Sequence, residues 1–95
     1  MGAYSFGNFG TGKSANEVFK SLAEQDRHEN GHEYSGGIGM KRSFVVIDVP
    51  SGKDPVQFAN DLIDAGDARV DDKWGPAGCV KVSEGKWYFF GWASS

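Results

Sequence analysis

This 95-residue sequence has one cysteine, no long apolar run and no excess of positive charge, and each of these features argues against a class of protein. A single cysteine, Cys79, rules out an internal disulfide and leads us to expect a reducing, cytoplasmic location. No apolar run approaches the roughly 18 residues of a membrane-spanning helix. The N-terminus also lacks the basic and apolar regions of a secretion signal. The net charge of -3 argues against general nucleic-acid binding, which needs a basic face.

Glycine and aromatic residues are plentiful, and the apolar pattern divides the chain into seven expected elements. Alternating apolar residues indicate strands, and apolar residues at helical spacing indicate helices. The expected strands are 3–9, 34–40, 43–49, 78–83 and 86–93, and the expected helices are 14–29 and 55–65. The β-branched run in 43–49 favours a central strand.

Local signals mark where these elements begin and end. Ser14–Glu17 spells a capping box, and Asp54-Pro55 supplies a cap followed by a proline at the first helical position. Asn30-Gly31 and Gly66 predict the two helix ends. Glu84-Gly85 predicts a tight hairpin between the last two strands.

The order β-α-β-β-α-β-β predicts a single domain, residues 1–95, of the α+β class. We expect a two-layer sandwich, a ferredoxin-like variant with two helices on one face of a mainly antiparallel sheet. Lys41-Arg42 is expected on the turn between the second and third strands. Aromatic residues point to both sides of strand 86–93, so one face would be exposed unless a partner covers it or the core wraps both sides.

Two short motifs that match known catalytic or phosphate-binding sites have weak support here. His28–His32 reads H-E-x-x-H, but Asn30-Gly31 breaks the helix that a zinc site of this kind requires. Gly7–Ser14 reads G-x-x-x-x-G-K-S, yet a short chain with two helices lacks the parallel sheet of a phosphate-loop domain. We expect a helix end and a glycine-rich turn instead, with no metal and no cofactor.

The acidic residues and the cysteine also favour structural roles. The spacing of the acidic residues fits no calcium loop, and Cys79 lies in a strand pattern without a base to activate it. A solvated loop and a buried thiol are the expected outcomes. The acidic residues concerned are Asp64, Asp67, Asp71 and Asp72.

Two stretches differ from an ordinary scaffold. Residues 31–37 place an imidazole, a phenol and a hydroxyl beside glycines, a mixture that suits a polar or phosphate-bearing ligand. The alternative is a turn that feeds a strand through a bulge. Residues 73–78 and the aromatic strand after them offer rings for stacking. The expected ligand-binding residues are His32, Tyr34, Ser35, Gly36, Lys73, Trp74 and Trp92.

These stretches resemble a family of small proteins encoded by bacteriophages and some bacterial genomes. Gly31–Ile38 resembles its G-H-x-x-Y-[ST]-G-x-I loop, with one residue fewer between His and Tyr. Lys73–Gly78 and Phe89–Ser95 match its K-W-G-P-A-G and F-F-G-W-A-S-S segments. The family has no settled activity, so the resemblance implies a phage setting more than a reaction.

The favoured function is therefore a non-enzymatic binding protein that sequesters a nucleotide-like signal of bacterial antiviral defence. We expect a homo-oligomer in the bacterial cytoplasm, without membrane association. One alternative is an inhibitor that binds a host protein through the aromatic strand 86–93. Another is a small hydrolase or phosphodiesterase that uses His32 as general acid and base.

Overall fold

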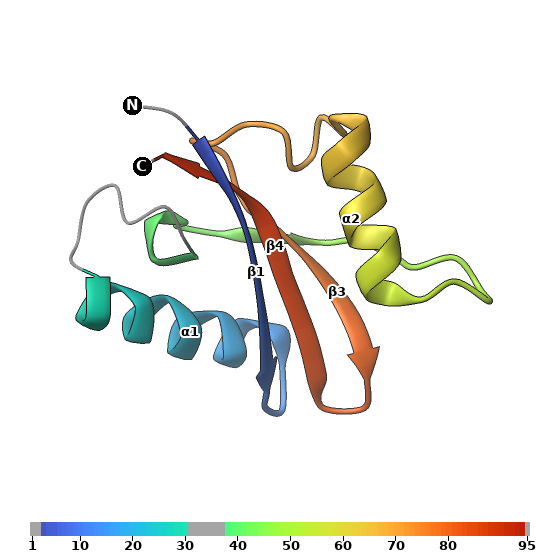
Figure 1. Cartoon of the computed structure of the whole chain (residues 1–95). Coiled ribbons are helices and arrows are strands. Elements are labelled where there is room, and N and C mark those ends of the chain that lie inside the picture. The colour runs from blue at the N-terminus through green and yellow to red at the C-terminus, as the bar shows by residue number, and fades with distance from the viewer. Residues whose placement is uncertain (1–2, 31–37, 95) are drawn as a thin grey trace.

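The computed structural model describes residues 3–30 and 38–94 (Figure 1). Four strands, two α-helices and one short 3-10 helix follow one another in these ranges. They are β1 (Ala3–Thr11), α1 (Ala15–Asn30), η1 (Ile38–Met40), β2 (Phe44–Val46), α2 (Pro55–Ala65), β3 (Ala77–Ser83) and β4 (Lys86–Ser94). The α+β class is confirmed. No helix in these ranges is long and apolar enough to cross a membrane.

The sheet is mixed, with the strand order β1-β4-β3-β2. β4 pairs antiparallel with β1 on one side and with β3 on the other. β2 pairs parallel with β3, because α2 carries the chain from the end of β2 back to the start of β3. The first and last strands of the chain thus lie side by side, and β1 and β2 form the two edges.

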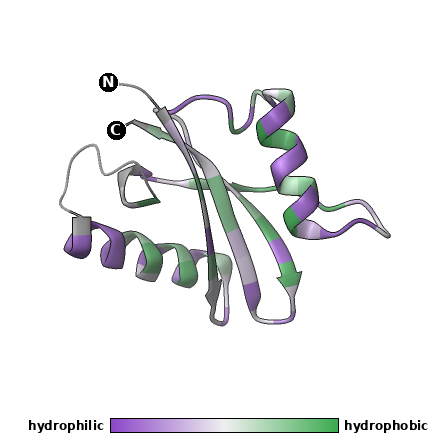
Figure 2. Ribbon diagram, in the orientation of Figure 1, coloured by the Kyte–Doolittle hydropathy of each residue, from purple (hydrophilic) through white to green (hydrophobic). Residues whose placement is uncertain are grey.

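The two helices cover opposite faces of this sheet, so the expected two-layer arrangement with both helices on one face is wrong. Phe89 packs with Val18 and Phe19 of α1. Phe90, the next residue of β4, packs with Ala59 and Leu62 of α2. Neighbouring residues of a strand point to opposite faces, and both faces of β4 are apolar, so each needs its own cover. Hydrophobic segments occur along both helices (Figure 2).

The expected hairpin of strands 34–40 and 43–49 is also wrong where the structure describes it. Residues 38–40 form a 3-10 helix, and residues 34–37 lie outside the described ranges. The expected central strand is a three-residue edge strand, Phe44–Val46, extended by a bond from Ile47 N–H to the Cys79 carbonyl at 2.8 Å. Its β-branched residues gave the right local geometry but carried no information on its neighbours.

The start and stop signals at Ser14, Asp54, Gly66 and Gly85 are confirmed, whereas Gly31 of the predicted Asn30-Gly31 stop lies outside the described residues. The Ser14 hydroxyl accepts from the Glu17 amide at 3.2 Å, and the Asp54 carboxylate accepts from the Gln57 amide at 2.9 Å. Gly66 ends α2 with a φ of 69°. The turn at Gly85 has a φ of 74°, so glycine is favoured at both positions. Short-range hydrogen bonding decided these boundaries, which is why the sequence predicted them.

Candidate functional site

The expected ligand-binding loop cannot be placed, because its four residues lie outside the described ranges. These residues are His32, Tyr34, Ser35 and Gly36. The remaining expected site residues, Lys73, Trp74 and Trp92, are described. They stay candidates, and their surroundings show what they offer a ligand.

A buried lysine organises the loop that carries Lys73 and Trp74. The Lys41 side chain is only 2% exposed. Its Nζ donates to the carbonyl oxygens of Asp72 at 3.3 Å, Lys73 at 3.1 Å and Gly75 at 2.9 Å. Burial lowers the pKa of Lys41 below its ordinary value, while the negative charge of Asp72 acts in the opposite direction. Lys41 is therefore buried beneath this loop, and the expected hairpin turn at Lys41-Arg42 is wrong for Lys41.

The same loop displays Trp74 to solvent. The Asp72 carboxylate accepts from the Trp74 amide at 2.8 Å, which folds the backbone into a tight local turn. Trp74 is 62% exposed, and the Lys73 ammonium lies 5.6 Å from the centroid of its ring. The structure thus brings Lys73 and Trp74 together as a cation–π pair.

Trp92 is half-buried near the end of β4, opposite Ser5 of β1. It lies two residues beyond Phe90, which pairs with Gly78 at the start of β3. Since Lys73 and Trp74 lie in the loop that leads into β3, all three residues occupy the same end of the sheet.

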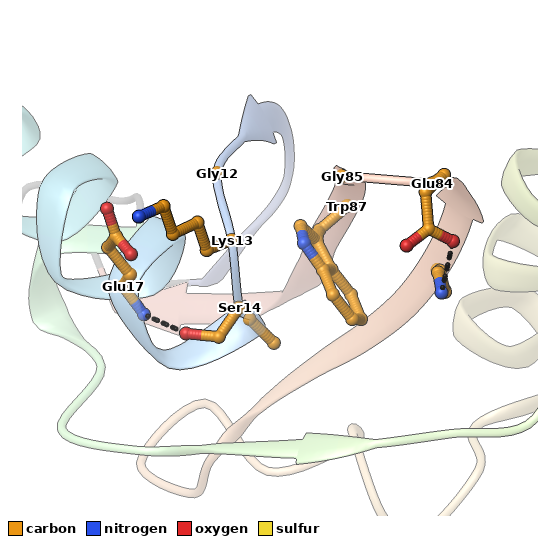
Figure 3. A pocket seen from close by; sticks show the side chains of 9 residues that line it. Gly12, Lys13, Ser14, Glu17, Glu84, Gly85 and Trp87 are labelled. Carbon is orange, nitrogen blue, oxygen red and sulfur yellow. Dashed lines mark hydrogen bonds and ion pairs between the residues drawn. The ribbon is translucent and has the colours of Figure 1, made fainter.

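A pocket of about 710 Å³ lies at the other end of the sheet (Figure 3). It lies between the turn from β1 to α1 and the β3–β4 hairpin, which are tied together by a bond from Gly12 N–H to the Gly85 carbonyl at 3.0 Å. The lining residues are Gly12, Lys13, Ser14, Ala15, Glu17, Lys81, Glu84, Gly85 and Trp87.

Trp87 lies between the two walls of this pocket (Figure 3). Its Nε1–H group is buried and has no hydrogen-bond acceptor among the described residues. The Lys81 ammonium lies 5.7 Å from the Trp87 ring and 3.2 Å from the Glu84 carboxylate. The pocket therefore combines an aromatic ring with side chains of both charges.

The pocket and the surface around Trp74 are separate. Trp87 and Trp92 are five residues apart on β4, which corresponds to about 16 Å along a strand. The pocket residues were not among the expected site residues. The phosphate-loop motif drew attention to Gly12–Ser14. Trp87 and Lys81 lie beside these residues only because β1 pairs with β4 and β4 pairs with β3.

The structure also shows where the described residues of the two catalytic motifs lie. Residues 7–11 of the phosphate-loop motif belong to β1, so only Gly12–Ser14 form a turn. This agrees with the prediction of a glycine-rich turn in place of a phosphate loop. His28 lies exposed in the last turn of α1, and His32 lies outside the described ranges. Within residues 3–30 and 38–94, no three His, Cys, Asp or Glu side chains are grouped so as to hold a metal ion.

The acidic loop and the cysteine have the expected surroundings. Asp67 accepts from the Arg69 guanidinium at 2.9 Å and from its amide at 3.0 Å. The hydrogen bonds with Arg69 lower the pKa of Asp67 to about 2. Cys79 is fully buried, and burial raises the pKa of its thiol to about 12. Such a thiol is a poor nucleophile at neutral pH.

Comparisons with known proteins add no relative to this description. A scan against protein-family models, a search of the curated proteins and a search of the solved structures find no match to this chain.

Proposed function

We propose that this chain is a non-enzymatic binding protein that holds a small, nucleotide-like molecule. The observation that carries the proposal is the pocket between the β1–α1 turn and the β3–β4 hairpin, where the Trp87 ring lies beside two lysines and two glutamates.

The charges of the pocket fit a molecule with both phosphate oxygens and hydrogen-bond donors. Lys13 and the first amides of α1 favour an anion, because a helix begins with unpaired N–H groups and a positive dipole end. Glu17 and Glu84 bring acceptors for hydroxyl or amino groups. Two lysines and two glutamates line the pocket, so a nucleotide finds partners for its phosphate and for its donor groups, whereas a bare phosphate ion would use only the lysines.

We further propose that the protein acts by occupancy, sequestering a nucleotide signal in the bacterial cytoplasm during phage infection. The phage setting rests on the resemblance of the segments 31–38, 73–78 and 89–95. Sequestration needs affinity and abundance but no reaction, so it is compatible with a thiol held neutral at Cys79.

The inhibitor alternative loses most of the surface on which it was built. Tyr88, Phe89 and Phe90 of β4 are buried under the two helices. Of the aromatic residues of strand 86–93, this leaves the half-buried Trp87 and Trp92 for a host protein. The hydrolase alternative rests on His32 alone, which lies outside the described ranges.

Calorimetry and native mass spectrometry test the proposal. The wild-type protein is titrated with cyclic nucleotides and nicotinamide-derived nucleotides, with inorganic phosphate for comparison. We expect at least one nucleotide to bind and phosphate alone to bind much more weakly. Lys13→Ala should weaken binding about tenfold or more, because it removes a charged partner of the phosphate.

Two further variants separate the pocket from other sites. Trp87→Ala removes the aromatic ring that lines the pocket, so it should also weaken binding. Lys20→Ala removes an exposed lysine of α1 outside the pocket and should leave the affinity unchanged. Failure of the whole panel to bind would contradict the proposal. Binding that survives Lys13→Ala but is lost in Trp74→Ala would move the site to the loop held by Lys41.

A further inference from the structure

The outer edge of β1 is an unusually open strand edge. Among the described residues, β1 pairs with β4 on one side and with no strand on the other. Its nine residues, AYSFGNFGT, include no charged residue and no proline, and its register with β4 runs without a bulge. Natural proteins ordinarily protect an edge strand with charged residues, prolines or bulges, or by keeping it short. β2, at the opposite edge, has only three residues.

The backbone groups that β1 offers are defined by its register. Gly12 donates to Gly85 at 3.0 Å, and this pair continues the register of β1 with β4. Hydrogen-bonded and non-hydrogen-bonded pairs alternate in an antiparallel ladder. The even-numbered residues of β1 therefore bond to β4, and the N–H and C=O groups of Ser5, Gly7 and Phe9 point outward from the sheet.

Two aromatic side chains along this edge are incompletely covered. Tyr4 is 62% exposed and Phe9 is 49% exposed, while Ser5 and Gly7 are also exposed. Phe9 contacts Tyr88, with ring centroids 4.7 Å apart, so this aromatic surface is continuous with the core. The edge thus combines unpaired backbone groups with apolar surface that gains from burial.

We propose that β1 pairs antiparallel with β1 of a second copy of this chain, so that two four-stranded sheets become one continuous sheet. The fullest overlap of residues 3–11 places the two-fold axis at Gly7. Tyr4 then lies opposite Gly10 of the second copy, and Phe9 lies opposite Ser5 of the second copy. Each exposed aromatic ring meets a small residue, so the strand is complementary to itself in this register.

The unequal edges favour this closed pair over other assemblies. A contact of β1 with β2 of another copy would use three residues and would repeat into an open filament. The β1–β1 contact uses nine residues and closes after two copies. The absence of charge on β1 also favours an identical neutral strand over a charged peptide.

The pairing is expected to be concentration-dependent. Only two exposed aromatic side chains per copy, Tyr4 and Phe9, are added to the backbone bonds, which places the interface near the small end of specific interfaces. Sedimentation velocity and native mass spectrometry from about 1 μM to about 1 mM cover the corresponding range of dissociation constants. We expect a monomer at the lower end and a dimer, without larger species, at the upper end.

Substitutions at Ser5 test the edge without disturbing the pairing of β1 with β4. Ser5→Lys introduces the residue that natural edges use for protection, and Ser5→Pro removes an outward N–H group. Both should weaken dimerisation about tenfold or more, with unchanged far-ultraviolet circular dichroism. Ser83→Lys, the same change at an exposed residue of β3, should dimerise like wild type.

A spin label at Thr11→Cys in a Cys79→Ala background tests the register. The two labelled positions are eight residues apart along the paired strands, so their backbones should lie about 27 Å from each other. A monomer at every concentration, a dimer insensitive to Ser5→Lys, or a clearly different distance would each overturn the proposal. So would a complex with a strand of another protein in place of the dimer.

Discussion

At the scale of single residues, Cys79 shows how burial without a partner changes chemistry. Its thiol lies in a fully apolar part of β3, and burial raises its pKa from the ordinary 9.0 to about 12. In the unfolded chain the thiol ionises near pH 9, whereas in the folded chain it stays protonated to about pH 12. Between these values the unfolded state binds fewer protons, so stability falls as pH rises.

We therefore predict that the free energy of unfolding decreases between pH 9 and pH 12 partly because of Cys79. Urea unfolding under reducing conditions measures it. Cys79→Ala should be less stable than wild type at pH 8 because it leaves a small cavity, but the difference should shrink as pH rises. Tyr88 and Lys41 titrate in both proteins, so they largely cancel in the comparison. A difference that stays constant from pH 8 to pH 11 would contradict the prediction.

At the scale of elements, the loop between α2 and β3 depends on a residue from a distant part of the chain. Lys41 follows η1, yet its ammonium group binds three carbonyl groups of residues 72–75. Each of these carbonyls would otherwise need another donor. The loop conformation, and with it the position of Trp74, thus depends on one buried charge as well as on the local turn at Asp72.

Replacing this charge should loosen the loop. Lys41→Met keeps most of the side-chain volume but removes the donor, and we predict a loss of about 2–4 kcal/mol in unfolding free energy. Hydrogen exchange should accelerate at the amides of residues 72–75. Arg42→Met is the matched control, because Arg42 is exposed and next in sequence, so its effect should stay within about 0.5 kcal/mol. Equal stability of the two variants would show that Lys41 does not hold the loop.

The elements also show what a sequence can predict. Ser14, Asp54, Gly66 and Gly85 act through neighbours within a few residues, so their signals are visible in the sequence. The order of strands depends on pairings between distant segments, and the same β-branched run fits a central or an edge position. The burial of Lys41 depends on three carbonyls more than 30 residues away, so no local pattern announces it.

The candidate site also has one part that the sequence predicts and one part that it does not. The turn at Gly12–Ser14 can be predicted from the sequence, because its glycine, lysine and serine form a recognisable motif. Trp87 is distant in sequence and reaches the turn only because the first and last strands pair, with Gly10 opposite Trp87. Pairing between chain ends is the kind of contact that composition and periodicity do not encode.

At the scale of the whole molecule, the two cores share one sheet. The α1 core and the α2 core lie on opposite faces of β3 and β4, where Cys79 and Phe89 alternate with Val80 and Phe90. Loss of either helix would expose one face of these central strands to water. The two halves of the molecule should therefore unfold together rather than one after the other.

Matched substitutions in the two cores test this cooperativity. Val18→Ala in the α1 core and Leu62→Ala in the α2 core should each cost about 2–4 kcal/mol. Because both faces depend on the same strands, each variant should shift one common urea transition, with far-ultraviolet circular dichroism and tryptophan fluorescence coinciding. If Leu62→Ala instead produced an early loss of helix signal while the fluorescence transition stayed in place, α2 would be an independently unfolding unit. The sheet would then be stable with one face uncovered, which the apolar side chains of Val80 and Phe90 make unfavourable.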